Sequence, residues 1–181
     1  MNSQAYVALL RGINVGRAKR IAMADLRVLV EGLGYTGVRS LLNSGNVVFR
    51  APGTTAQAAA QAIEEALVLR LGVAARVFVL GRDELGAIID GNPLLGVATD
   101  HARLFVFLLG EAVRRDRLAV LDGRDWGCEQ LVLGERAAYV WCPEGMLVSA
   151  AATSLGKLLG DGTTSRNWHT LLKLQALCGE T

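Results

Sequence analysis

Two glycine-bearing segments near the N-terminus carry side chains suited to holding an anion. Residues 11–17 read Arg-Gly-Ile-Asn-Val-Gly-Arg, and residues 43–46 read Asn-Ser-Gly-Asn. An arginine presents a planar fork of donors that matches phosphate or carboxylate oxygens, and glycine lets the backbone approach a ligand closely. The side chains that we expect to bind a ligand here are Arg11, Asn14, Ser44 and Asn46. The alternative is that the glycines only shape tight turns and that Ser44 and Asn46 satisfy their own hairpin.

A third polar segment lies near the C-terminus, where residues 163–170 read Thr-Thr-Ser-Arg-Asn-Trp-His-Thr. Thr164 or Ser165 is a suitable N-cap for a following helix, and the free N–H groups of a helix N-terminus favour an anion. We therefore add Arg166 and Asn167 to the candidate ligand-binding residues. The tryptophan that follows is more typical of a core anchor, and the histidine after it is more typical of a solvated face.

Known catalytic and metal-binding patterns do not occur in this sequence. It contains no phosphate-binding glycine loop of either common kind and no Gly-x-Ser-x-Gly nucleophile turn. The three cysteines, Cys128, Cys142 and Cys178, have no Cys-x-x-Cys spacing, and the chain has two histidines. We therefore expect reduced thiols, no metal and no cofactor. Cys142 could act as a nucleophile beside His169, but a buried thiol is the simpler interpretation.

Composition argues for a cytoplasmic protein without a membrane segment. The chain has 181 residues, of which 51% are hydrophobic and 20% charged, so it is too apolar for a disordered tail. No apolar run approaches the ~20 residues of a spanning helix, and the N-terminus lacks the pattern of a signal peptide. The net charge is +2 overall. Residues 1–50 nevertheless carry seven basic and two acidic side chains, which indicates an anion-facing patch or a general preference for arginine.

The first half of the chain reads as a βαββαβ unit, the ferredoxin-like pattern. Apolar runs predict strands at residues 5–10, 38–43, 47–50 and 75–80, and helical spacing predicts helices at 23–33 and 55–71. In this arrangement the first two strands are parallel and the third lies between them. The segments at residues 11–17 and 43–46 should therefore meet at the same edge of the sheet.

The second half repeats the opening of this pattern. After a short helix at 83–90, we predict a strand at 103–109 and a helix at 111–121. A hairpin of strands at 129–133 and 136–141 comes next, followed by helices at 149–159 and 166–178. The order is βαββαα. The sequence thus predicts an α+β protein with a ferredoxin-like subdomain, residues 1–90, and a second α+β subdomain, residues 91–181, packed together as one unit.

Several motifs together resemble one bacterial family. They are Ala8-Leu9-Leu10-Arg11-Gly12-Ile13-Asn14-Val15-Gly16, Met23-x-Asp25-Leu26, Ser44-Gly45-Asn46-Val47-Val48-Phe49 and Thr164-x-Arg166-Asn167-Trp168-x-Thr170. In this order, over roughly residues 6–177, the chain resembles the family catalogued as domain of unknown function 1697. The resemblance implies two α+β subdomains, the first of them ferredoxin-like, and it implies no established activity.

Three hypotheses about function follow. In the first, the three polar segments form one pocket for a phosphate- or carboxylate-bearing ligand, such as a nucleotide or RNA. Alternatively, the chain is an interaction or dimerisation module without a small-molecule site. A third hypothesis is an enzyme that acts on a small metabolite at the same pocket, with His169 as its candidate catalytic residue. The sequence alone predicts neither a reaction nor an oligomeric state.

Overall fold

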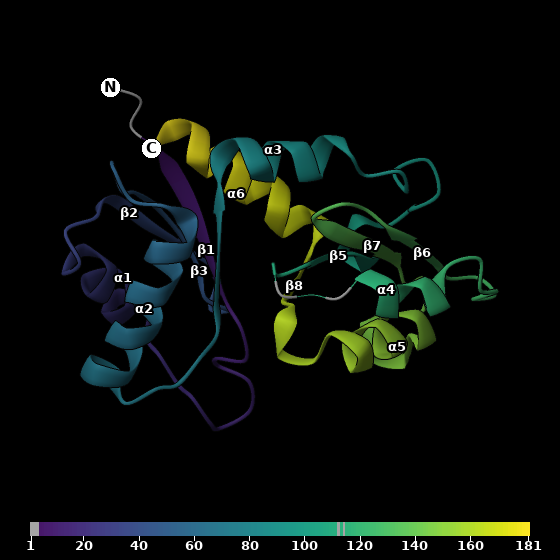
Figure 1. Ribbon diagram of the computed structural model, residues 1–181, viewed down its shortest axis with the longest axis horizontal. Coiled ribbons are helices and arrows are strands. Elements are labelled where there is room, and N and C mark those ends of the chain that lie inside the picture. Colours follow the sequence, from purple (N-terminus) through teal and green to yellow (C-terminus); the bar gives the residue numbers. More distant parts are fainter. Residues whose placement is uncertain (1–3, 112, 114) are drawn as a thin grey trace. The chain divides into compact units, whose positions relative to one another are not determined.

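The computed structural model describes residues 4–111, 113 and 115–181, and its chain divides into two compact units (Figure 1). The first unit extends to Gly86 and also takes in Lys173–Thr181, whereas the second comprises Ala87–Leu172. Two helices, α3 (Arg82–Asp90) and α6 (Trp168–Glu180), contribute residues to both units. The expected α+β class is confirmed, because each unit contains a four-stranded antiparallel sheet with helices.

The first unit follows the predicted βαββαβ order. Its elements are β1 (Ala5–Leu10), α1 (Met23–Glu31), β2 (Thr36–Leu41), β3 (Asn46–Arg50), α2 (Ala56–Leu71) and β4 (Val77–Gly81). The strands lie in the order β2-β3-β1-β4, and every neighbouring pair is antiparallel. The third strand therefore lies between the first two, as predicted.

Local sequence signals set the limits of α2, the longest helix of this unit. The Thr55 side chain accepts a hydrogen bond from the Ala58 N–H, as expected of an N-cap. Gly72 ends the helix with a φ of 65°, a left-handed conformation that glycine adopts without strain. The buried residues between these ends recur at helical spacing and face the sheet: Ala59, Ile63, Ala66 and Leu67.

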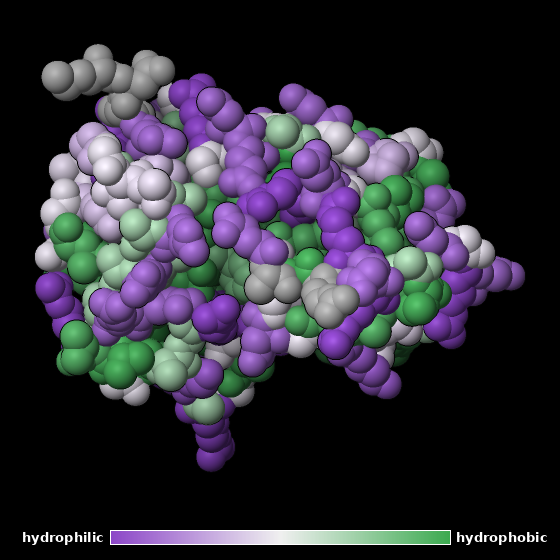
Figure 2. All heavy atoms as spheres, viewed as in Figure 1, coloured by the Kyte–Doolittle hydropathy of each residue, from purple (hydrophilic) through white to green (hydrophobic). Residues whose placement is uncertain are grey.

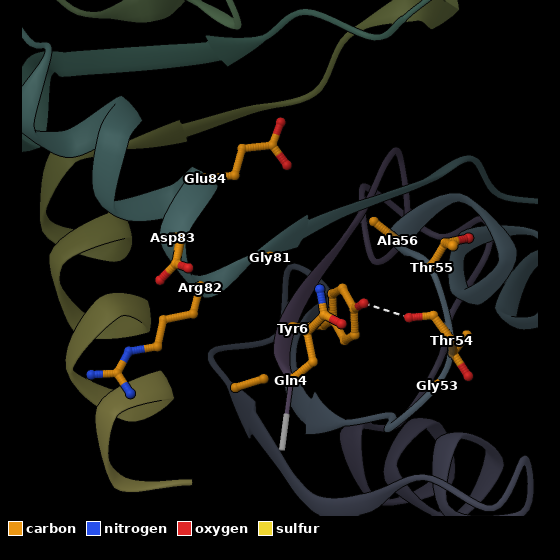
Figure 3. Close-up of a pocket in the computed structure, with 11 residues that line it drawn as sticks. Gln4, Tyr6, Gly53, Thr54, Thr55, Ala56, Gly81, Arg82, Asp83 and Glu84 are labelled. Atoms are coloured by element: carbon orange, nitrogen blue, oxygen red, sulfur yellow. Dashed lines mark hydrogen bonds between the residues drawn. The ribbon is translucent and has the colours of Figure 1, made fainter. Parts of the chain in front are cut away.

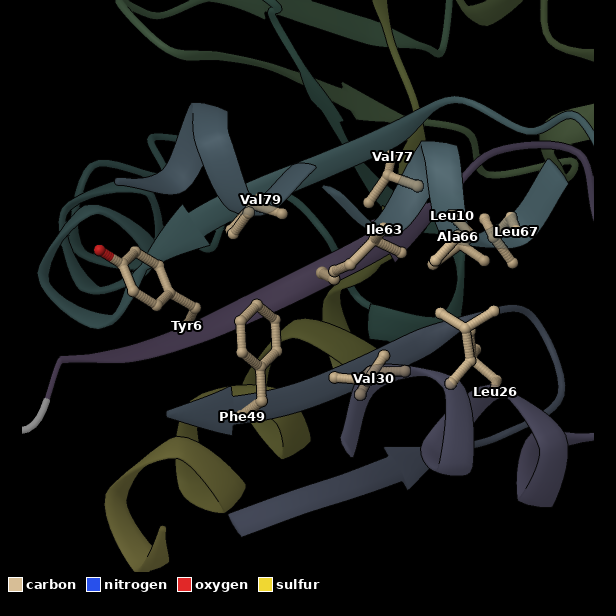
Figure 4. Packing of buried hydrophobic residues seen from close by; sticks show 14 of the residues in the cluster. Tyr6, Leu10, Leu26, Val30, Phe49, Ile63, Ala66, Leu67, Val77 and Val79 are labelled. Carbon is tan, nitrogen blue, oxygen red and sulfur yellow. The ribbon is translucent and has the colours of Figure 1, made fainter. Parts of the chain in front are cut away.

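Strand β1 is central, and all six of its residues are buried. Its alternate residues Tyr6, Ala8 and Leu10 belong to the core cluster that includes Leu26 and Ile63 of the two helices (Figure 4). The Tyr6 and Phe49 rings stack with centroids 5.8 Å apart. Burial on both faces explains why β1 reads as a continuous apolar run rather than an alternating one.

The second unit has the same strand order as the first, although it is formed by a different part of the sequence. Its elements are β5 (Leu104–Leu108), α4 (Arg115–Leu118), β6 (Gln130–Leu133), β7 (Ala137–Trp141), α5 (Ala150–Leu159) and β8 (Ser165–Asn167), followed by α6. The sheet order is β6-β7-β5-β8, again with antiparallel pairs. The predicted helix at 111–121 is shorter, with a 3-10 turn after α4, and its Ala112 and Arg114 lie outside the described residues.

One predicted element is wrong at its start. The last helix was expected from Arg166, but Ser165–Asn167 forms strand β8 against β5, and α6 begins at Trp168. The N-cap is therefore neither Thr164 nor Ser165: the Asn167 side chain accepts from the Thr170 N–H at 3.0 Å. Thr, Ser and Asn all cap helices well, so the sequence held three competing start signals within four residues. The second unit is thus βαββαβ plus α6, rather than βαββαα.

No helix within the described residues combines the length and hydropathy that crossing a bilayer requires.

Candidate functional site

The loop that joins β1 to α1 contains a cluster of basic residues. We call residues 11–20 the basic loop. Its backbone takes a positive φ at four positions, two of them not glycine, Asn14 at 54° and Lys19 at 50°. The Asn14 N–H donates to the Lys19 carbonyl at 3.1 Å and so closes the loop on itself. Asparagine tolerates this left-handed conformation better than most residues.

The Asn14 side chain holds the loop in this shape. Its Nδ2 donates to the Ile21 carbonyl at 2.9 Å and to the Asn43 carbonyl at 2.7 Å. Its Oδ1 accepts from the Ile21 N–H at 2.8 Å. Asn14 was predicted to bind a ligand, but these bonds occupy both amide hydrogens. Its role in any site is therefore to position the loop.

The turn between β2 and β3 lies against the same loop. The Leu10 N–H donates to the Gly45 carbonyl at 2.8 Å, and Asn14 reaches Asn43 as described. The predicted meeting of the two N-terminal segments is therefore confirmed. Asn46 is fully buried, and its Nδ2 donates to the Leu41 carbonyl and to Ser44 Oγ, both at 2.9 Å. These bonds are what the hairpin interpretation of Ser44 and Asn46 requires.

Positive charge gathers on the outer part of the basic loop. Arg17, Lys19 and Arg20 are exposed, and Arg11 is half-buried. Hydrophilic side chains project from this loop at the lower edge of Figure 2. No acidic residue occurs between positions 11 and 24. The Arg11 N–H donates to the carbonyl of Arg76, and the guanidinium of Arg76 lies 3.7 Å from Glu64.

The remaining predicted residues, Arg166 and Asn167, belong to the second unit. Arg166 donates to Thr164 Oγ1 at 2.9 Å and to the Ser165 carbonyl at 2.8 Å. Burial lowers the pKa of Arg166 to about 10, so the guanidinium remains charged at neutral pH. Asn167 caps α6, as described above. A single pocket that joins these two residues to the basic loop therefore stays a prediction.

Two expectations about neighbouring residues are met. Trp168 is buried, as expected of a core anchor, and His169 is exposed. Cys142 is also buried, and burial raises the pKa of its thiol. A buried thiol with a raised pKa is a poor nucleophile, so the structure favours the interpretation of Cys142 as a core residue.

The sequence did not predict a pocket that lies at the start of β1 and the end of β4, away from the basic loop (Figure 3). This cavity of about 1200 Å³ is open to solvent and lies within the first unit. Its lining comes from the start of β1, the first turns of α2 and α3 and the segment before α2: Gln4, Ala5, Tyr6, Gly53, Thr54, Thr55, Ala56, Gly81, Arg82, Asp83 and Glu84.

The pocket's chemistry is mixed. The Tyr6 hydroxyl donates to the Thr54 carbonyl, and burial, with a smaller contribution from Tyr35, raises the pKa of Tyr6. Arg82 is followed by Asp83 and Glu84 in the first turn of α3, and the side chains of Arg82 and Glu84 point in different directions (Figure 3). Because charges of both signs line the cavity, it favours no single class of ligand. The sequence offered one usable signal for it, the N-cap at Thr55.

Comparison with solved structures finds a similar whole chain. The conserved bacterial protein SP0830 from Streptococcus pneumoniae is 25% identical, with a TM-score of 0.79. The similarity covers 97% of this chain and 98% of that one. A comparison with curated proteins finds no match.

Family comparison agrees with the first three motifs noted in the sequence, whereas the fourth, at residues 164–170, lies beyond the matched residues. The family described as protein of unknown function (DUF1697) matches residues 3–139, which is well over half of the 181 residues. The matched region contains β1, the basic loop, the β2–β3 turn and the strands of the second unit up to Tyr139 in β7. The chain therefore belongs to the DUF1697 family.

Proposed function

We propose that this protein binds a phosphate-bearing anion, such as a nucleotide or RNA, through the basic loop. The observation that carries the proposal is the exposure of Arg17, Lys19 and Arg20 on a stretch without any acidic residue. Exposed cations that lack acidic neighbours attract phosphate groups over several ångströms, and the attraction weakens as salt is added.

The shape of the loop supports the proposal. The Asn14 side chain donates two hydrogen bonds and accepts a third, and these hold the loop against Ile21 and Asn43. A loop that is already ordered loses less conformational entropy when a ligand binds, so more of the electrostatic attraction contributes to affinity. In this proposal Arg17, Lys19 and Arg20 contact the phosphate groups, and Asn14 and Asn46 position the backbone beneath them.

The test compares one loop variant with a control of equal charge. The loop variant replaces Arg17, Lys19 and Arg20 with serine. The control replaces Arg117, Lys157 and Lys173, three exposed cations on helices α4, α5 and α6, with serine. Fluorescence anisotropy measures binding to a labelled single-stranded RNA, with ATP and inorganic phosphate as competitors that distinguish a polymer from a small ligand.

We expect the control to bind as the unmodified protein does and the loop variant to bind at least tenfold more weakly. The logarithm of the affinity should fall with the logarithm of salt, with a slope of about 0.7 for each phosphate contacted on a single strand. Equal losses in the two variants, or no saturable binding of RNA, ATP or phosphate at low salt, would refute the proposal.

A further inference from the structure

The two histidines of this chain, 68 positions apart, lie beside each other in the second unit. The ring centroids of His101 and His169 are 5.8 Å apart, and the ring planes are tilted by 59°. The fold explains the meeting. A 3-10 turn, His101–Arg103, leads directly into β5, and Phe105 of β5 pairs with Asn167 of β8. His169 follows that strand in the first turn of α6.

Both imidazole rings are available to a ligand. His169 is exposed and His101 is half-buried. Among the residues that the structure describes, neither ring has a hydrogen-bond partner. The adjacent carboxylate of Asp100 is already engaged, since it accepts from the Ala102 N–H at 2.9 Å and lies 3.6 Å from Arg103 Nε.

The separation of the rings suits a shared metal ion. Neutral imidazole is a preferred ligand of Zn²⁺, Ni²⁺ and Cu²⁺. With metal–nitrogen bonds of about 2.0–2.1 Å, each ring centroid lies about 3.2 Å from the ion, so two imidazoles on one ion place their centroids roughly 4.5 Å apart at a right angle, about 5.2 Å at the tetrahedral angle and about 6.4 Å in a straight line. The observed 5.8 Å lies between the tetrahedral and the linear values.

We propose that His101 and His169 form a two-imidazole clamp for a late first-row divalent cation. The described residues hold no group of three or more His, Cys, Asp or Glu side chains that could bind a metal. Two protein ligands leave the other coordination positions to water. The positive end of α6 lies beside His169 and weakens cation binding further. We therefore expect micromolar affinity, with Ni²⁺ bound more tightly than Co²⁺ in the usual order.

The test measures Ni²⁺ binding by isothermal titration in a Cys128→Ser background, because the exposed Cys128 thiol is itself a metal ligand. The variants are His101→Gln and His169→Gln, with circular dichroism as the check on folding. The control is Lys173→Gln, one helical turn after His169. Because chelation makes the second bond intramolecular, loss of either ring should weaken binding by about a hundredfold. The control removes a positive charge near the site, so it should bind one ion per chain at least as tightly as the parent protein.

A second readout separates a clamp from two independent histidines. On titration with Zn²⁺, the imidazole resonances of both histidines should shift together and saturate at one equivalent. Shifts that saturate at two equivalents, equal affinity after removal of one ring, or no binding at millimolar Ni²⁺ would overturn the proposal. None of these outcomes bears on the basic loop, which lies in the other unit.

Discussion

Gly45 shows how one residue controls the junction of the basic loop with the sheet. It lies in the turn between β2 and β3 with a φ of +83°. A Cβ atom at this position would lie 2.7 Å from Leu10 Cβ and 2.8 Å from Ile13 Cδ1. Both neighbours are buried, so neither can move without disturbing the core. Only glycine meets both the conformational and the spatial demand here.

Replacing Gly45 with alanine should therefore lower the free energy of unfolding by about 2–4 kcal/mol, from backbone strain and overpacking together. Urea denaturation followed by circular dichroism measures the change. Gly53→Ala is the control, because Gly53 also has a positive φ, +75°, but nothing within 4 Å of the added Cβ. It should lose only about 1–2 kcal/mol. Equal losses in the two variants would contradict the packing argument.

At the level of elements, the start of α6 depends on a single side chain. Asn167 Oδ1 accepts from the Thr170 N–H at 3.0 Å and from Thr170 Oγ1 at 2.8 Å. Thr170 is buried, so removing the acceptor leaves its hydroxyl without this partner in a place that water reaches poorly.

Asn167→Ala should accordingly reduce the free energy of unfolding by about 1–2 kcal/mol, as expected for the loss of an N-cap. Asn167→Ser keeps a capping oxygen and should recover most of the loss. Thermal or urea unfolding of both variants gives the comparison. If Ser165→Ala lowered the free energy of unfolding more than Asn167→Ala does, the N-cap of α6 would be Ser165 rather than Asn167.

Most elements could be predicted because their burial repeats with a period or runs without interruption. The six buried residues of β1 and the α2 stripe from Ala59 to Leu67 are of this kind. Strand β8 could not be predicted, because its three half-buried residues, Ser165–Asn167, carry no apolar pattern. Their strand state comes from pairing with β5, a contact made across 60 positions of chain.

The candidate site was predictable to a lesser degree. Strand topology was enough to bring residues 11–17 and 43–46 together, and the Asn14–Asn43 bond confirms that step. The role of Asn14 in positioning the loop could not be predicted, because its hydrogen bonds depend on a positive φ at a residue other than glycine. The pocket beside Tyr6 was missed because three segments far apart in the sequence line it, residues 4–6, 53–56 and 81–84, and many of the lining side chains are small.

Across the whole molecule, the same strand arrangement occurs twice. The orders β2-β3-β1-β4 and β6-β7-β5-β8 are equivalent when the strands of each unit are counted from its first. Each unit has a core cluster of its own, one containing Phe49 and Leu67 and the other Phe107 and Leu155. Ionisable side chains are also buried in both units, among them Tyr6, Tyr139, Cys142 and Cys178, and their burial affects stability in alkali.

Burial raises the pKa of five groups, distributed over both units: Tyr6, Tyr35, Tyr139, Cys142 and Cys178. The largest shift is that of Cys178, whose pKa rises from 9.0 to about 11. A raised pKa means that the folded chain keeps its proton at a pH at which the unfolded chain loses it. The stability that these groups contribute is therefore complete below about pH 8 and declines as the pH rises.

We expect the free energy of unfolding to fall by on the order of 2 kcal/mol between pH 8 and pH 10, chiefly as the thiols ionise in the unfolded chain. Urea titrations under reducing conditions measure the change. The lowered pKa of Arg166 acts in the opposite direction as the pH approaches and passes 10, so the comparison ends there. Cys178→Ala leaves a cavity that costs stability at every pH, but its decline from pH 8 to pH 10 should be smaller than that of the unmodified protein by about 1 kcal/mol. An undiminished decline in this variant would show that the Cys178 thiol is not protected by the core.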